Sequence, residues 1–400
     1  MYRAIYAYAW DLAQRPVAEI VAELRGLGLN TVTLATSYHA GKFLRPRAQT
    51  GKVYFPEDGT VYFKPRLERY GILRPQPNSM IEEQDPLAAL CATKEIQANG
   101  WMVLLHNSRI GAEHPEATVR NAFGDNYIYS LCPSNPAVRE YAINLCTDLA
   151  DAYGVSGITL ETPGFLPYTH GYHHEFAQVE HNSWLDALLG LCFCEHCFDG
   201  ARQHGIDAVS LCQWVAERIE AYLASPVSAP PEVTADWLLA DIVVNPDLGA
   251  FLLWRCAQVS ALVSEIRGEL RTDLVLAVIP TIQRTLSSAW LEGSDLNVLA
   301  QSADAVELPF YQSSAERIAA DAWDATRRMA GGTLRGILRP GPPDITSRKD
   351  LLANLVALRS GGVKDFAFYN YGLLRPVNLR WMRDTLAALD SSGTAGAASR

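Results

Sequence analysis

The chain has 400 residues, of which 48% are hydrophobic and 20% charged, and its formal net charge is −10. This length and apolar fraction are ample for a large core. The acidic balance, without any long run of Lys or Arg, argues against a nucleic acid or an anionic membrane as partner.

The N-terminal segment MYRAIYAYAW lacks the basic and apolar regions of a secretion signal. No window approaches the roughly 18 consecutive apolar residues that indicate a membrane span. We therefore expect a cytoplasmic protein with no membrane partner, in which cysteines stay reduced and clustered cysteines are metal ligands rather than disulfides.

Short apolar, β-rich segments recur along the chain with helical patterns between them. The predicted strands are residues 4–10, 31–38, 101–107, 157–162, 274–280, 304–311, 334–340 and 365–371. A helix is expected over residues 86–99, and another begins near Pro136. This alternation indicates βα units around a parallel sheet, and eight units favour a closed (β/α)8 TIM barrel over an open, doubly wound sheet. No glycine-rich nucleotide-binding motif follows any of these strands.

The longest departure from the alternation follows the fourth strand. Residues 163–247 are predicted to form a long, mostly helical insertion, and a Tyr-, Pro- and Gly-rich loop follows the second strand up to about residue 84. We expect one barrel domain over residues 1–390 that includes this insertion. The small, polar segment 391–400 is expected to be a disordered tail.

The segment LCFCEHCF (191–198) contains three cysteines within six positions. Three thiolates this close in the chain suit one tetrahedral ion, and structural zinc normally takes four protein ligands. Cys132 is the preferred fourth ligand because its loop follows strand three, on the face where the loop after strand four also emerges. The other candidates are Cys146, Cys212, Cys256 and His196. A redox pair of Cys194 and Cys197, or three unrelated buried thiols, remains an alternative.

Several segments together resemble the family 42 glycoside hydrolases, which are zinc-containing β-galactosidases. They are CPSNPAVREYA (132–142), LET (160–162), CFCEHCF (192–198), DAVELPFY (304–311) and RPGPPD (339–344). The resemblance implies a (β/α)8 barrel that cleaves glycosidic bonds with retention, and it leaves a homo-oligomer open. It also implies a structural Zn²⁺ held by Cys132, Cys192, Cys194 and Cys197.

The resemblance further implies an acid/base glutamate after strand four and a nucleophilic glutamate after strand seven. Glu161 matches the first, at the end of an apolar strand where desolvation would raise its pKa. The sequence departs from the family at Leu160, where asparagine is expected, and at strand seven, where Ile337 or Leu338 fills the nucleophile's place. Glu307 is the predicted substitute, against the alternative of a structural salt bridge with an arginine such as Arg339, and Asp11 is a weaker candidate.

Aromatic and polar side chains at the predicted strand ends suit a sugar-binding wall. The predicted substrate-binding residues are Trp10, Asp11, His39, His106, Asn107, Arg109, His170, His173, Tyr311, Arg339, Tyr369 and Asn370. Arg109 and Arg339 could also recognise an anionic sugar. The segment PYTHGYHHE (167–175) has three interpretations: a substrate-contacting loop, a second metal site that includes His174 and Glu175, or an ordinary surface loop.

The sequence thus predicts a glycoside hydrolase-like enzyme that acts on a small-molecule or oligosaccharide substrate, with Glu161 and Glu307 as its carboxylates. Two alternatives remain. One is a carbohydrate-binding barrel that has lost its chemistry, and the other is a sugar isomerase or lyase that uses the histidine-rich loop.

Overall fold

The computed structural model describes residues 1–171, 177–282, 286–329 and 331–397, the last six by their backbone alone. His173, His174 and Glu175, which were predicted to contact substrate or a metal, lie outside the described residues.

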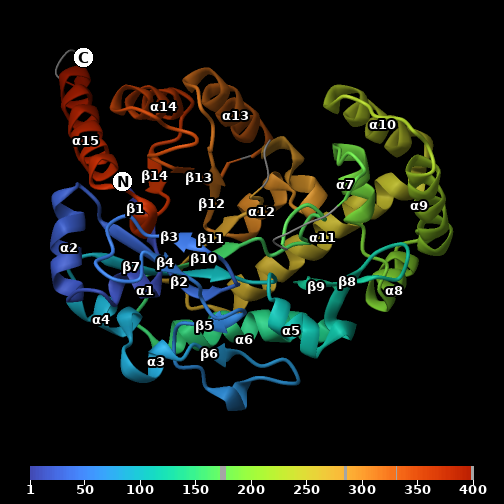
Figure 1. Cartoon of the computed structure of the whole chain (residues 1–400), viewed down its shortest axis with the longest axis horizontal. Helices are drawn as coiled ribbons and strands as arrows, with labels where there is room; N and C mark the ends of the chain where they lie inside the picture. The colour runs from blue at the N-terminus through green and yellow to red at the C-terminus, as the bar shows by residue number, and fades with distance from the viewer. Residues whose placement is uncertain (172–176, 283–285, 330, 398–400) are drawn as a thin grey trace.

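Eight parallel strands form a closed barrel, which lies on the left in Figure 1. They are β1 (Arg3–Ala7), β2 (Thr31–Tyr38), β7 (Gln97–Val103), β10 (Gly157–Glu161), β11 (Val275–Ile279), β12 (Ala305–Pro309), β13 (Thr333–Leu338) and β14 (Asp365–Phe368). Each strand pairs with the next, and β1 pairs with both β2 and β14, so the sheet closes on itself. The predicted (β/α)8 fold is confirmed.

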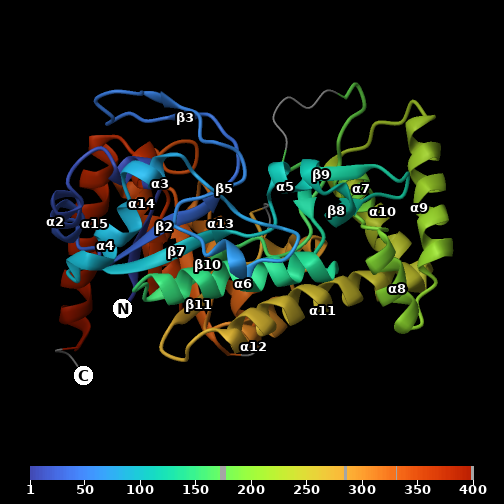
Figure 2. The ribbon, with the colours of Figure 1, turned by 90° about the horizontal axis from the view of Figure 1, so that it is seen from below.

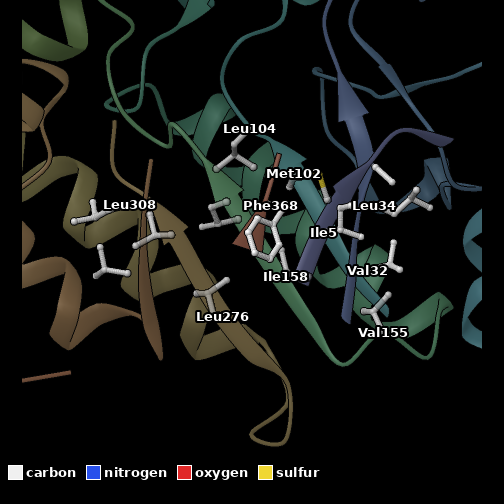
Figure 3. Packing of buried hydrophobic residues seen from close by; sticks show 14 of the residues in the cluster. Ile5, Val32, Leu34, Met102, Leu104, Val155, Ile158, Leu276, Leu308 and Phe368 are labelled. Carbon is white, nitrogen blue, oxygen red and sulfur yellow. The ribbon is translucent and has the colours of Figure 1, made fainter. Parts of the chain in front are cut away.

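Side chains alternate between two apolar layers along each strand, as the pleat requires. Ile5, Ile158 and Leu308 belong to the larger core between the sheet and the surrounding helices, which Figure 3 shows from close by. The alternate positions point into the barrel, where Tyr6 and Trp101 are among the buried side chains. Glu161 and Glu307 also alternate with outward-facing neighbours, so both carboxylates face the barrel interior.

An outer ring of helices covers the barrel (Figures 1 and 2). It consists of α2 (Val17–Gly26), α4 (Pro86–Thr93), α6 (Pro136–Ala152), α11 (Pro246–Glu269), α12 (Leu296–Ser302), α13 (Ala315–Arg328), α14 (Arg348–Ser360) and α15 (Pro376–Ala397). Helix α4 is shorter than the predicted 86–99 because Lys94 adopts a left-handed conformation with φ of 52°, which ends the helix. Strand three consequently begins at Gln97, earlier than expected. The backbone of α15 is helical as far as Ala397, where the composition had suggested disorder.

Short additional helices and strands follow the first, second, third, fifth and eighth strands of the barrel. They are α1 (Ala9–Leu12), β3 (Phe43–Leu44), β4 (Val53–Tyr54), β5 (Thr60–Val61), η1 (Leu67–Arg69), β6 (Gln76–Pro77), α3 (Met80–Glu83), α5 (Ser108–Glu113), η2 (Pro115–Ala117), β8 (Thr118–Arg120), β9 (Asn126–Leu131), η3 (Leu286–Glu292) and η4 (Tyr371–Leu373).

The insertion after strand four forms a helical lobe beside the barrel (Figure 1). It contains α7 (Ser183–Leu189), α8 (Glu195–Gln203), α9 (Ala208–Leu223) and α10 (Pro231–Val244). The lobe has an apolar core of its own, to which the long helix α11 contributes Phe251 and Trp254. Within the described residues no single helix is long and apolar enough to cross a membrane, although α10 and α11, bent by 100° at their junction, meet that criterion as a pair.

The packing of α5 against β9 requires a glycine at position 111. A Cβ atom there would lie 1.8 Å from the carbonyl oxygen of Ile128. We therefore expect Gly111→Ala to lower the free energy of unfolding by about 2 kcal/mol or more, because the backbone cannot move aside as a side chain can. Denaturant unfolding measures this change. Gly154→Ala is the control, since nothing lies within 4 Å of its Cβ position, and an equal loss in both variants would contradict the prediction.

Candidate active site and metal site

Glu161 is the last residue of β10 and lies at the C-terminal end of the barrel, where TIM-barrel enzymes carry their chemistry. Its side chain is partly exposed, unlike the preceding residues of the strand. Trp101 of β7, which is 1% exposed, donates a hydrogen bond from Nε1 to Oε2 of Glu161 at 2.6 Å. Strand β7 neighbours β10, so the sheet register itself holds this donor beside the carboxylate.

Tyrosine side chains surround this carboxyl group. Tyr8 is fully buried, and its hydroxyl group is 3.1 Å from that of Tyr38 and 2.6 Å from that of Tyr369. Burial raises the pKa of Tyr38, Tyr311 and Tyr369, and the nearby charge of Glu161 raises all three further. These phenols therefore stay protonated and can act as hydrogen-bond donors at the strand ends.

Desolvation by these aromatic neighbours raises the pKa of Glu161 to about 7, against the smaller lowering effect of the Trp101 hydrogen bond. A carboxyl group with this pKa exchanges protons near neutral pH, as a general acid/base must. The next residue, Thr162, has a φ of 46°, which is unusual for a β-branched side chain. Local backbone strain of this kind is concentrated at functional sites.

A second carboxylate lies in the loop after strand seven, and the sequence reasoning missed it. Asp344 is 5% exposed and forms an ion pair with Arg339, the residue that directly follows β13. The Arg339 guanidinium lies over the Tyr311 ring, with Cζ 4.3 Å from the centroid. The charges of Glu161 and Asp344 both raise the pKa of Tyr311, so the two acids lie near the same phenol. The available signal was the position of Asp344 in RPGPPD, as the first acid after strand seven.

Glu307 lies deeper in the barrel and does not join this group, contrary to the prediction. It is fully buried, accepts a hydrogen bond from Tyr6 Oη at 2.8 Å, and lies 3.7 Å from Nη1 of Arg335. The Tyr6 ring packs edge-on against Trp101, with 5.1 Å between centroids, and thus lies between the two glutamates. The structural ion pair is therefore the better interpretation of Glu307, with Arg335 as its partner rather than Arg339.

Several other predicted binding residues have structural contacts instead. Trp10, 3% exposed, stacks between Tyr8 and Tyr54. Burial raises the pKa of Asp11 to about 6, although its ion pair with Arg45 at 3.1 Å opposes that shift.

Asn107 and Asn370 accept hydrogen bonds from backbone N–H groups as helix caps. Arg109 pairs with Glu113 at 2.9 Å. Of the predicted wall, Tyr311, Arg339 and Tyr369 remain partly exposed near Glu161.

Three histidines that were predicted to bind substrate continue the group of aromatic rings that includes Tyr38. The ring of His39 stacks on Tyr38 at 4.4 Å and on His106 at 4.0 Å, and the His170 ring lies 5.4 Å from that of His106. These rings come from the loops after strands two, three and four. Within the described residues, however, the cysteine cluster is the one group of His, Cys, Asp and Glu side chains that could hold a metal.

The structure brings Cys132 together with Cys192, Cys194 and Cys197, as predicted. The Cys132 sulfur lies 3.6 Å from those of Cys194 and Cys197 and 3.8 Å from that of Cys192. Tetrahedral zinc with Zn–S bonds of about 2.3 Å requires sulfurs about 3.8 Å apart, so the donor set and its spacing fit zinc. All four thiols are buried, and four thiolates would leave no coordination site for water.

The cluster joins two loops on the same side of the barrel. Cys132 directly follows β9, whereas Cys192 and Cys194 lie between α7 and α8, and Cys197 lies in the first turn of α8. Backbone contacts support the junction, since Phe193 N–H donates to Arg120 O at 2.6 Å and Arg120 N–H points at Cys192 Sγ at 3.4 Å.

Solved structures similar to this chain include several glycoside hydrolases. The glycoside hydrolase domain of PgaB (BpsB) from Bordetella bronchiseptica has a TM-score of 0.58 and 14% identity, over 96% of this chain and 98% of that one. The alpha-L-fucosidase isoenzyme 2 from Paenibacillus thiaminolyticus has a TM-score of 0.57 and 11% identity, over 98% of this chain and 50% of that one. The beta-galactosidase from Bacillus circulans sp. alkalophilus has the same TM-score and identity, over 96% of this chain and 55% of that one.

No family model and no curated protein matches the sequence. At these identities the structural similarity shows the fold alone, so membership of glycoside hydrolase family 42 is not shown. The chain has the barrel fold of glycoside hydrolases.

Proposed function

We propose that this protein is a glycosidase in which Glu161 is the acid/base and Asp344 the second carboxylate. The observation that carries the proposal is the partly exposed Glu161, with a pKa of about 7, at the C-terminal end of β10. Asp344 replaces Glu307 in this role because it lies with Arg339 near Tyr311, whereas Glu307 is enclosed beneath Tyr6.

In the proposed reaction, neutral Glu161 donates its proton to the glycosidic oxygen as the bond to the anomeric carbon breaks. The leaving group departs as an alcohol, and positive charge develops on the sugar ring. Water then bonds to the anomeric carbon and loses a proton, either to the Asp344 carboxylate or to Glu161, which the first step left ionised. In the second case Asp344, paired with Arg339, stabilises the positive charge on the sugar ring. The Tyr311 and Tyr369 hydroxyl groups are suited to donate hydrogen bonds to sugar hydroxyls, and their rings can pack on the apolar face of a sugar.

A carbohydrate-binding barrel without chemistry is the second candidate. It is favoured by one observation, the absence of a carboxylate on β13 itself, whose residues read TLRGIL. Fewer observations support an isomerase or lyase, because the histidines that the structure describes do not form a group that could bind a metal.

We also propose that Zn²⁺ occupies the four-cysteine cluster and has a structural role. The short sulfur–sulfur distances and the burial of all four thiols support this assignment. When bound, the ion would hold the β8–β9 hairpin against the helical lobe and supply no chemistry to the substrate.

Isosteric substitutions can distinguish the roles of Glu161, Asp344 and Glu307. Glu161→Gln and Asp344→Asn should each lower kcat/KM about 10²- to 10⁴-fold, because each removes a proton carrier or a charge from the reacting groups. Glu307→Gln should keep kcat/KM within about threefold of wild type but lower the free energy of unfolding by about 2–4 kcal/mol, because it leaves Arg335 without its anion.

Turnover of a panel of 4-nitrophenyl glycosides and oligosaccharides measures the activity, and denaturant unfolding measures the stability. Full activity in Glu161→Gln would remove that residue from the mechanism. Sugar binding without turnover by the wild-type protein across the panel would favour the second candidate.

The pH dependence of activity tests the role of Glu161 as an acid. Because the acid must be protonated, kcat/KM should fall tenfold per pH unit above about pH 7. Trp101→Phe removes the hydrogen bond that stabilises the ionised form, so the pKa should rise and this decline should begin at a higher pH. Trp10→Phe is the control, since within the described residues the indole nitrogen of Trp10 forms no hydrogen bond. If kcat/KM of Trp101→Phe falls over the same pH range as that of the wild type, the assignment of Glu161 as the acid is contradicted.

Metal analysis tests the zinc site. We expect one tightly bound zinc per chain, and we expect Cys132→Ser to lose it and to unfold at a temperature about 5 °C lower or more, because metal binding is coupled to folding. Cys212→Ser, a half-buried cysteine outside the cluster, should keep the metal. Zinc retained in full by Cys132→Ser would exclude this ligand set.

A further inference from the structure

Arg255 of α11 is a buried cation without an anionic partner among the described residues. It is 1% exposed, and its guanidinium lies over the ring of Phe165, with Cζ 4.3 Å from the centroid. Its one hydrogen bond runs from Nη2 to the carbonyl oxygen of Gly190, at 3.1 Å. Neither Nε nor Nη1 has a hydrogen-bond partner, and within the described chain no carboxylate forms an ion pair with it. A buried charge of this kind is costly unless it is compensated.

The four-cysteine cluster offers the missing negative charge. Four thiolates and one Zn²⁺ carry a net charge of −2, and all four sulfurs are buried, so this charge is equally costly without a cation nearby. Gly190, which accepts the Arg255 hydrogen bond, is two residues before Cys192. Burial lowers the pKa of Arg255, and the neighbouring Cys256 together with three cysteines of the cluster, Cys192, Cys197 and Cys132, opposes that lowering.

We infer that Arg255 is the counter-ion of the zinc–thiolate cluster and stabilises the bound metal electrostatically. The inference depends on the proposed zinc, but not on the proposed chemistry at Glu161. Each buried charge compensates the other: the metal-loaded cluster supplies the anion that the guanidinium lacks, and Arg255 offsets part of the −2 charge. Its contacts with Gly190 and Phe165 also place it between the loop after β10 and the loop that carries Cys192.

Two substitutions distinguish the effect of the Arg255 charge from the effect of its packing. Arg255→Gln keeps a donor for Gly190 but removes the charge, whereas Arg255→Lys keeps the charge but loses the planar stacking on Phe165. We expect Arg255→Gln to release zinc to a chromogenic chelator about tenfold faster or more, the usual scale for residues that support metal ligands. Arg255→Lys should stay within about threefold of wild type.

Arg120→Gln is the matched control. Its backbone N–H contacts Cys192, but its guanidinium is partly exposed and bonds Asn126 at 3.1 Å, so losing this charge should leave zinc release unchanged. Unfolding midpoints with and without zinc provide a second measurement.

Two sets of results would overturn the inference. In one, Arg255→Gln lowers both midpoints equally while zinc release is unchanged, which would mark Arg255 as a packing residue. In the other, Arg255→Lys releases zinc at least tenfold faster than wild type, and this comparison stands even where Arg255→Gln fails to fold. A wild-type protein without bound zinc would remove the metal proposal and this inference together, while the activity panel would still test Glu161 independently.

Discussion

Desolvation of the Glu161 carboxyl group is the constraint on which the proposed chemistry depends. An acid in water would be ionised at neutral pH, and only the low-dielectric surroundings at the end of β10 bring its pKa to about 7. The aromatic side chains of the barrel interior create those surroundings, while the Trp101 indole limits the shift with one hydrogen bond. Because Trp101 lies on β7, which pairs with β10, the hydrogen-bond donor and the acid are held by neighbouring strands of the barrel.

The barrel interior contains two separate polar centres, one above the other. The lower centre consists of Glu307, Arg335, Tyr2 and Tyr6. There the Glu307 carboxyl group has hydrogen-bond donors and a cation beside it but no access to substrate. Glu161 belongs to the upper one, which is partly exposed. Burial raises the pKa of both acids, yet only the upper one, Glu161, is partly exposed. A raised pKa therefore identifies a functional acid only together with access.

The sequence was sufficient to predict the barrel, because each strand is a distinct apolar run and eight of them alternate with helices. The cysteine cluster could be predicted equally well, because the C-x-C-x-x-C spacing and the loop position of Cys132 restrict the set of possible ligands. The depth of Glu307 could not be predicted, because its height in the barrel depends on strand register and tilt, which alternation alone does not give. The roles proposed for Asp344 and Arg255 could not be predicted for a related reason. The position of Asp344 after strand seven is visible in the sequence, but its pairing with Arg339, and the proximity of Arg255 to the loop that carries Cys192, appear only when the loops are placed in space.

Three of the four clustered cysteines lie within the long connection that begins at Glu161. The chain leaves β10 at Glu161 and returns at Val275, and closing such a long connection costs conformational entropy. The proposed metal would link residues within this connection, divide it into shorter closed segments and anchor one of them to the β8–β9 hairpin. Arg255 lies on the returning helix and contacts Phe165, four residues after Glu161. The same buried charge pair would thus stabilise the proposed metal and order the chain that leaves Glu161, the proposed acid.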